Sequence, residues 1–194
     1  MLGRFRVASM TFLTRKMMLE PVEFHSGGSD PMTFKVSEPS TRHLRAIWSE
    51  LGAALTGRRT FEVAHGWDGN HAWGPSFVLT HDIPDGWPRP NSTVHFVTDG
   101  IDSAVTQAKA AAAGKAVGVH GADTIQQLLN AGLLDEISVD IAAVFLGSGV
   151  RLFDNLVIAP SVLRNPTVFA GAGVYARALR GTPALGDKSS AVPP

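Results

Sequence analysis

The sequence predicts an α/β domain with a central mixed, mostly parallel sheet, flanking helices and a C-terminal antiparallel hairpin. Two observations predict this class. Short apolar runs that suit buried strands alternate with segments of helical periodicity from residue 41 to residue 145. The last two strand-like runs, 162–169 and 174–179, are joined by the small residues Ala-Gly-Ala-Gly, which is typical of a hairpin.

The N-terminal part of the chain contains one strand-like run and a long irregular segment. Alternation of side chains at 5–12 predicts the first strand. Residues 13–40 carry three prolines and the sequence Gly-Gly-Ser-Asp without a sustained period, so we expect an atypical long loop there. A helix at 41–51 and a short buried strand at 53–56 follow.

Turn residues separate the next apolar runs. The expected elements are a short helix opened by the turn at Gly57, a loop at 67–75, strands at 77–79 and 94–98, and a helix at 102–113 that Gly114 ends. The helix at 102–113 should bury Ala104, Val105 and Ala108, because these positions share one face.

Residues 115–153 form the most complete unit of strand, turn, helix and strand. The apolar run at 116–119 predicts a buried parallel strand, and alternation at 137–145 predicts a strand with one face more apolar than the other. Asp123 is the expected N-cap of the intervening helix, and Gly132 is expected to end it. The buried helix face should consist of Ile125, Leu128, Leu129 and Leu133.

Composition bounds the class of protein. The 194 residues suit one domain, which we place at 1–180, with a disordered tail at 181–194. Seventeen basic and seventeen acidic side chains cancel, so no global field favours nucleic acid or an anionic membrane. The absence of cysteine excludes disulfides and thiol catalysis. Without a long apolar stretch or a signal-peptide pattern, we expect a cytoplasmic location and no membrane partner.

Two turns are candidate anion sites. Gly121 and Ala122 lie where a strand meets a helix, and free N–H groups and the helix dipole favour a phosphate there; an ordinary turn is the alternative. Gly57 opens the second site, in which Arg58 and Arg59 can fork onto a phosphate; a solvated charged face is the alternative. Two such sites in one domain favour a ligand with several phosphates.

Other chemical motifs are sparse. Thr80 and His81 follow the buried strand 77–79, at the position where open α/β sheets bind ligands. The sequence lacks a GxGxxG turn, a phosphate-binding lysine loop and a GxSxG serine. The histidines show no metal-ligand spacing, so we expect no metal site. Phosphate-binding architecture without its own nucleophile indicates that a bound cofactor supplies the chemistry.

Five motifs in the same order resemble one known family. They are GRRTFE at 57–62, FVLTH at 77–81, HGA at 120–122, GLLDE at 132–136 and LGSGVRLF at 146–153. They resemble the reductase domains related to the C-terminal domain of the riboflavin biosynthesis deaminase-reductase. The resemblance covers residues 53–153 and extends loosely to 180, and it implies the three-layer dihydrofolate reductase-like fold of that family.

The resemblance also implies an activity and a cofactor. It indicates an NADPH-dependent reductase of a pyrimidine- or pterin-like heterocycle, similar to the reductases of 5-amino-6-(5-phosphoribosylamino)uracil, and a homodimer. It places NADPH phosphates on the two anion turns and the adenosine 2′-phosphate at the end of the strand between them. The residues so assigned are Gly57, Arg58, Arg59, Thr60, Thr80, His81, Gly121, Ala122, Asp123 and Thr124. Because a carboxylate repels phosphate, Asp123 is expected to cap the helix.

One departure from the family pattern concerns the first strand. Family members usually carry a Ser-x-Asp-Gly-like motif at its end, whereas Ser9 is followed here by Met-Thr-Phe without an acidic residue. The catalytic residues therefore stay unassigned. A nucleotide-binding protein without turnover and, ranked lower, a dihydrofolate reductase are the alternatives. Asp135, Glu136 and Arg151 are expected to be structural, with Arg151 as an anchor after the glycine loop.

Overall fold

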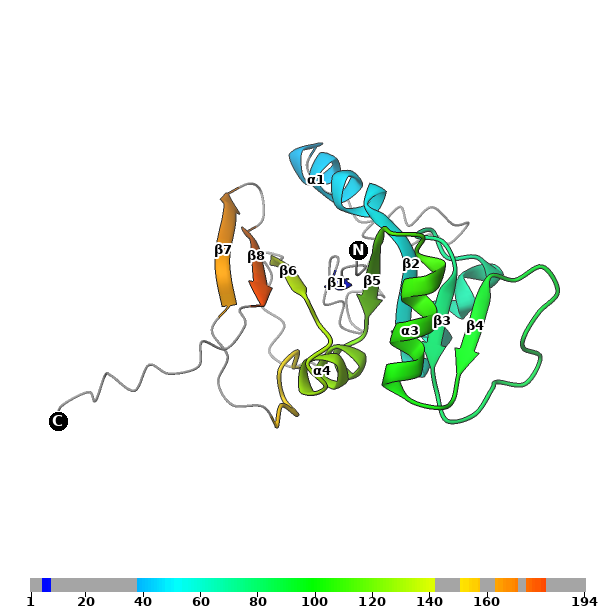
Figure 1. Ribbon diagram of the computed structural model, residues 1–194. Coiled ribbons are helices and arrows are strands. Elements are labelled where there is room, and N and C mark those ends of the chain that lie inside the picture. Colours follow the sequence, from blue (N-terminus) through cyan, green and yellow to red (C-terminus); the bar gives the residue numbers. More distant parts are fainter. Residues whose placement is uncertain (1–4, 8–37, 142–150, 158–162, 171–173, 181–194) are drawn as a thin grey trace.

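A computed structural model describes residues 5–7, 38–141, 151–157, 163–170 and 174–180. Its strands belong to one sheet in the order β4-β3-β2-β5-β1-β6-β8-β7 (Figure 1). The strands are β1 (Phe5–Val7), β2 (Leu51–Gly57), β3 (Ser76–Leu79), β4 (Val94–Val97), β5 (Ala116–His120), β6 (Glu136–Ile141), β7 (Leu163–Ala170) and β8 (Val174–Arg180).

The sheet is mixed and mostly parallel, as predicted. The pairs from β4 through β3, β2, β5 and β1 to β6 are all parallel. Strand β8 runs antiparallel to both β6 and β7, which confirms the C-terminal hairpin. Because β1 lies between β5 and β6, its carboxyl end opens at the same edge of the sheet as the turns after β2 and β5.

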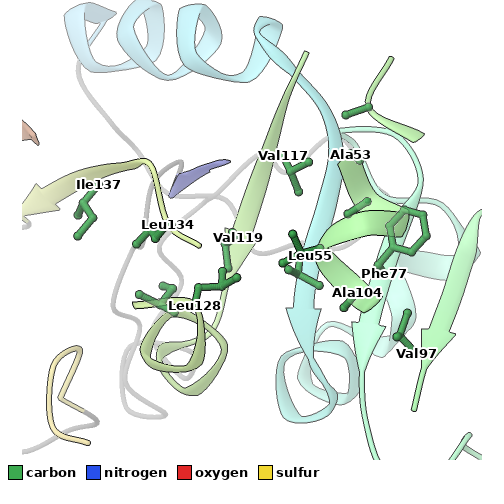
Figure 2. Packing of buried hydrophobic residues seen from close by; sticks show 14 of the residues in the cluster. Ala53, Leu55, Phe77, Val97, Ala104, Val117, Val119, Leu128, Leu134 and Ile137 are labelled. Atoms are coloured by element: carbon green, nitrogen blue, oxygen red, sulfur yellow. The ribbon is translucent and has the colours of Figure 1, made fainter. Parts of the chain in front are cut away.

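Helices α3 (Ile101–Ala111) and α4 (Ala122–Asn130) cover one face of the sheet, and α3 contacts both β2 and β3 (Figure 1). Between these layers lies the main core, in which Leu55, Val117 and Val119 are fully buried (Figure 2). The predicted inward positions of both helices are confirmed: Ala104, Val105, Ala108, Ile125 and Leu128 are buried, and Leu129 and Leu133 pack against them.

The opposite face is covered by α1 (Glu38–Ser49) and α2 (Arg58–Val63). Leu51, Ala54 and Trp73 form a small core there, against which Trp48 of α1 packs. The Trp73 ring occupies the space that a side chain at Gly118 would need. A glycine in the middle of β5 therefore lets the indole lie flat on the sheet.

Some predicted boundaries were wrong. Helix α1 begins at Glu38 and not at 41, because Pro39 stands in the first turn, where its missing N–H costs nothing. Leu51, predicted as the last helical residue, is 4% exposed and begins β2. The structure describes 38–40, 5–7 and 137–141 of the segments predicted at 13–40, 5–12 and 137–145, respectively. The rest of each segment, and the tail at 181–194, lies outside the described residues. Among the helices that are described, none has the length and apolar character of a membrane span.

Candidate functional site

The turns after β2 and β5 lie at neighbouring strand ends, and the helices that follow them pack on opposite faces of the sheet. These strands are parallel neighbours, with Thr56 opposite His120 at their carboxyl ends. After β2, α2 packs Phe61 against Val78 on one face, whereas after β5, α4 packs Ile125 into the core on the other face. Such a switch point leaves a crevice outside the carboxyl ends, which is where open α/β sheets bind ligands.

The two predicted anion turns approach each other closely at this point. A Cβ atom built on Gly121 would lie 3.0 Å from the Thr60 hydroxyl oxygen, and one on Gly57 would lie 3.0 Å from the Thr124 hydroxyl oxygen. Gly121 has a φ of 89° and is the N-cap of α4. Side chains at either glycine would therefore crowd the threonines, and Gly121 also adopts a backbone conformation that other residues avoid.

The first turn of α4 carries N–H groups and a hydroxyl that have no hydrogen-bond partner within the helix. Its first intrahelical bond runs from the Ile125 N–H to the Gly121 carbonyl, so the preceding N–H groups have no acceptor within the helix. No side chain caps this end. The Thr124 hydroxyl is buried and finds no hydrogen-bond partner among the residues that the structure describes. Free donors at the positive end of a helix favour an anion.

Asp123 does not cap α4, contrary to our prediction. The N-cap is Gly121, and the helix already begins at Ala122, which places Asp123 inside the first turn. Its carboxylate accepts a hydrogen bond of 2.7 Å from the Gln127 side chain four residues along. The predicted N-cap position was two residues late, because the glycine's positive φ brings the chain into the helix without a side-chain cap.

Arg58 and Thr80 converge from neighbouring turns. The Arg58 Nη1 donates to the Asp82 carbonyl oxygen at 2.8 Å, and the Thr80 hydroxyl donates to the same oxygen at 2.9 Å. The Arg58 Nε also pairs with the Glu62 carboxylate at 2.6 Å. The remaining guanidinium donors are free to fork onto an anion.

Arg59 and His81 complete the predicted set, and both are exposed. Neither side chain makes a hydrogen bond or ion pair with the other predicted residues within the described part of the chain. The sequence assignments thus separate into three groups. Gly57, Thr60, Gly121, Ala122 and Thr124 form one cluster with Asp123 beside it, Arg58 and Thr80 are linked through a carbonyl, and Arg59 and His81 stand in solvent.

A cluster of histidine and tryptophan side chains, which the sequence did not predict, lies on the other side of the β5 end. His120 stacks on Trp73, with ring centroids 4.2 Å apart and planes 10° from parallel, and Trp67 stacks more loosely on it at 6.3 Å. His71 packs its edge against both indoles. The Nε2 atoms of His71 and His120 are 3.1 Å apart.

The histidine pair is uncharged near neutral pH. Burial, and secondarily the neighbouring His120, lowers the pKa of His71 to about 3. Burial lowers the pKa of His120 to about 4. Both imidazoles therefore carry one proton each at pH 7, and hydrogen bonds decide which nitrogen holds it.

The segment that delivers Trp67 and His71 has an unusual backbone. In the 3-10 segment η2 (His65–Gly69), the residues His65, Trp67 and Asp68 have φ values of 49° to 51°. Each non-glycine residue in this left-handed region costs roughly 1–2 kcal/mol. Such strain persists where surrounding packing enforces it and is frequent at functional sites. The available sequence signal was a glycine-rich loop with two tryptophans and two histidines.

Two further expectations concern charged residues. Glu136 is 4% exposed at the start of β6, as expected for a structural residue. Arg151 is not a side-chain anchor: its guanidinium is 81% exposed and lies 3.6 Å from Asp154. The backbone at residues 151–152 is instead held by Gln126, whose side-chain amide donates to the carbonyl oxygens of Arg151 and Leu152. No group of three or more metal-ligating side chains gathers within the described residues.

Solved structures of other proteins share this architecture. A solved structure of a protein named for riboflavin biosynthesis from Shewanella sp. PV-4 is similar at 20% identity, over 80% of this chain and 85% of that one, with a TM-score of 0.57. The riboflavin biosynthesis reductase Rib7 of Saccharomyces cerevisiae is similar at 16% identity, over 75% and 82% of the chains, with a TM-score of 0.52. These likenesses show the dihydrofolate reductase-like fold.

Sequence comparison identifies the family. No curated protein matches the chain. The model of the family described as the RibD C-terminal domain matches residues 33–160, which is well over half of the 194 residues. This span includes α1 to β6 and both anion turns. The chain therefore belongs to the RibD C-terminal domain family.

Proposed function

We propose that this protein is a reductase that binds NADPH and delivers hydride to a pyrimidine- or pterin-like heterocycle. The observation that carries the proposal is the meeting of the turns after β2 and β5 at the switch point, where the buried Thr124 hydroxyl has no hydrogen-bond partner among the described residues. Family membership supports the reaction class, because Rib7, which has a similar fold, is by its name a riboflavin biosynthesis reductase.

The cluster fits a pyrophosphate. Gly57 and Gly121 let the two turns approach so closely that a Cβ atom on either glycine would lie 3.0 Å from a threonine hydroxyl oxygen. The N–H groups of the first turn of α4 and the Thr124 hydroxyl are donors, and a phosphate oxygen accepts them. Asp123, the one carboxylate in this turn, is bonded to Gln127 and exposed, so it leaves the donors available.

The second group of residues fits the adenosine end of the cofactor. Arg58 and Thr80 lie at adjacent strand ends, and the exposed Arg59 and His81 flank them in sequence. An arginine with spare donors is the side chain best suited to a phosphate monoester. We assign this group to the 2′-phosphate that distinguishes NADPH from NADH.

NADPH, when bound, supplies the hydride. The chain's own contribution is positioning: the first turn of α4 fixes the pyrophosphate, and the arginine turn fixes the adenosine end. Holding both ends leaves the nicotinamide near the carboxyl ends of β5 and β1, where the heterocycle must also bind.

Fluorescence titration with NADPH and NADH tests the cofactor assignment. We expect the wild type to bind NADPH more tightly, and Arg58→Ala to lose about ten-fold in NADPH affinity with little change for NADH. Arg45→Ala, which removes an exposed arginine from α1, is the matched control and should bind both as the wild type does. Equal binding of the two dinucleotides would refute the assignment of the arginine turn, and absence of NADPH binding would refute the function.

Turnover is tested by NADPH oxidation in the presence of a panel of pyrimidines, pterins and dihydrofolate. A nucleotide-binding protein without turnover is the second candidate, because Met-Thr-Phe follows Ser9 in place of the acidic motif, and the family match begins only at residue 33. Binding without oxidation of NADPH by any compound would favour it. Methotrexate-sensitive reduction of dihydrofolate would instead identify a dihydrofolate reductase.

We also propose a homodimer. Light scattering measures its mass directly, and twice the 20.6 kDa of one chain is expected. A mass of one chain at the concentrations used for NADPH titration would contradict it.

A further inference from the structure

The hydrogen bonds of the histidine pair determine which nitrogen of each ring carries the proton. The backbone N–H of Trp73 donates to the His71 Nδ1 at 3.1 Å, so this nitrogen has no proton. A neutral His71 therefore carries its proton on Nε2, and it donates to the His120 Nε2 at 3.1 Å. His120, neutral as well, must then hold its own proton on Nδ1.

His120 is also held in place as a ring. It stacks face to face on Trp73, and the Trp67 ring is near it, with ring centroids 6.3 Å apart. The Trp73 indole is itself buried on β5 over Gly118. None of the contacts described around His120 involves a charged group. The ring plane and the tautomer are thus both fixed before any ligand binds, which is the preorganisation that an oriented donor requires.

The donor that remains is on Nδ1 of His120. No acceptor for it exists among the described residues, and the side chain is only partly buried. His120 ends β5 and directly precedes Gly121, so it lies at the edge of the sheet where the switch point opens. An uncharged N–H at such a position suits an uncharged oxygen acceptor, since no ionic partner is needed.

We propose that His71 is a positioning residue that fixes His120 in its Nδ1–H tautomer, so that the end of β5 offers an uncharged donor to a ligand carbonyl oxygen. The ligand part rests on the proposed function, in which two carbonyl sources reach this edge: the ring carbonyl of the heterocycle and the carboxamide of nicotinamide. The role of His71 rests on the hydrogen bonds and on the neutral state of both rings, and it holds for any ligand.

Long-range proton–nitrogen NMR correlation of the ¹⁵N-labelled protein tests the tautomers at pH 7. We expect Nε2–H on His71 and Nδ1–H on His120 in the wild type. His71→Phe retains a ring between the indoles but removes the donor, and His120 should then populate the Nε2–H form. His71→Gln restores an amide N–H and should return His120 toward Nδ1–H. An Nε2–H form of His120 in the wild type, which requires no variant to fold, would overturn the proposal, as would a tautomer unaffected by His71→Phe.

Three small ligands test the acceptor. Uracil and nicotinamide each carry a carbonyl, whereas pyrimidine is a ring without one. Movement of the His120 Nδ1–H resonance with uracil or nicotinamide, and not with pyrimidine, identifies the source of the carbonyl. No movement with either would overturn the ligand part. NADPH titration of the same sample separates the outcomes: fixed tautomers without NADPH binding refute the proposed function and leave the role of His71 intact.

Discussion

The two sides of the β5 end differ in how far the protein completes them by itself. Toward α4, the Thr124 hydroxyl has no hydrogen-bond partner among the described residues, and the first N–H groups of the helix have no acceptor within it. Toward η2, His71 and His120 bond to each other, His120 stacks on Trp73, and His71 makes an edge-to-face contact with Trp67. We propose that an anion completes the first side, whereas the second is assembled in advance. Changes on the first should mainly alter NADPH affinity, and changes on the second should mainly alter stability and its pH dependence.

Acid should weaken the histidine side, and this is the largest effect we expect. The folded-state pKa values of about 3 for His71 and about 4 for His120 lie below the unfolded value of 6.5. Between these values the unfolded chain binds more protons than the folded chain, so the free energy of unfolding falls as the pH drops below 6.5. Above that pH, the stabilising contribution of the neutral pair is fully present. In urea denaturation, wild type should lose roughly 2–3 kcal/mol more than His71→Phe between about pH 7 and 4.5. Equal losses would show that His71 is not buried in its neutral form.

Filling the space on the α4 side should abolish most of the binding. Gly121→Ala puts a methyl group 3.0 Å from the Thr60 hydroxyl at a φ of 89°, and we expect NADPH affinity to fall roughly 30-fold, about 2 kcal/mol. Gly86→Ala is the control, because Gly86 also has a positive φ, 74°, but has nothing within 4 Å of a new Cβ. Both variants should lose roughly 1–2 kcal/mol of stability from the backbone. Similar NADPH affinities for Gly121→Ala and Gly86→Ala would contradict the assignment of the Gly121 turn to the cofactor.

Much of the scaffold was predictable because its signals are local. Val117 and Val119 in a buried strand, and Ala104, Val105 and Ala108 on an inward helix face, follow from periodicity, and the structure confirms them. The wrong boundaries arose where local rules compete. Pro39 is tolerated in a first helical turn, and the predicted cap at Asp123 lost to a glycine with positive φ.

The site was predictable only in part. Its glycines and threonines stand in turns that sequence motifs mark, whereas their mutual approach depends on β2 and β5 being neighbours. His71 and His120 are 49 residues apart, and no periodicity connects them. Their pairing follows from the left-handed turn at 65–69 and from the indole over Gly118, which are properties of the folded chain.

Thr124→Val tests the central claim most directly, because it removes one buried hydroxyl while keeping the side chain's shape. Without a partner in the described protein, that hydroxyl costs stability in the ligand-free state, so the variant should be about 1 kcal/mol more stable to urea than the wild type. If the hydroxyl binds the pyrophosphate, the same variant should bind NADPH about ten-fold more weakly. Higher stability together with weaker binding is the predicted result. NADPH affinity equal to that of the wild type would contradict the assignment of this turn to the cofactor.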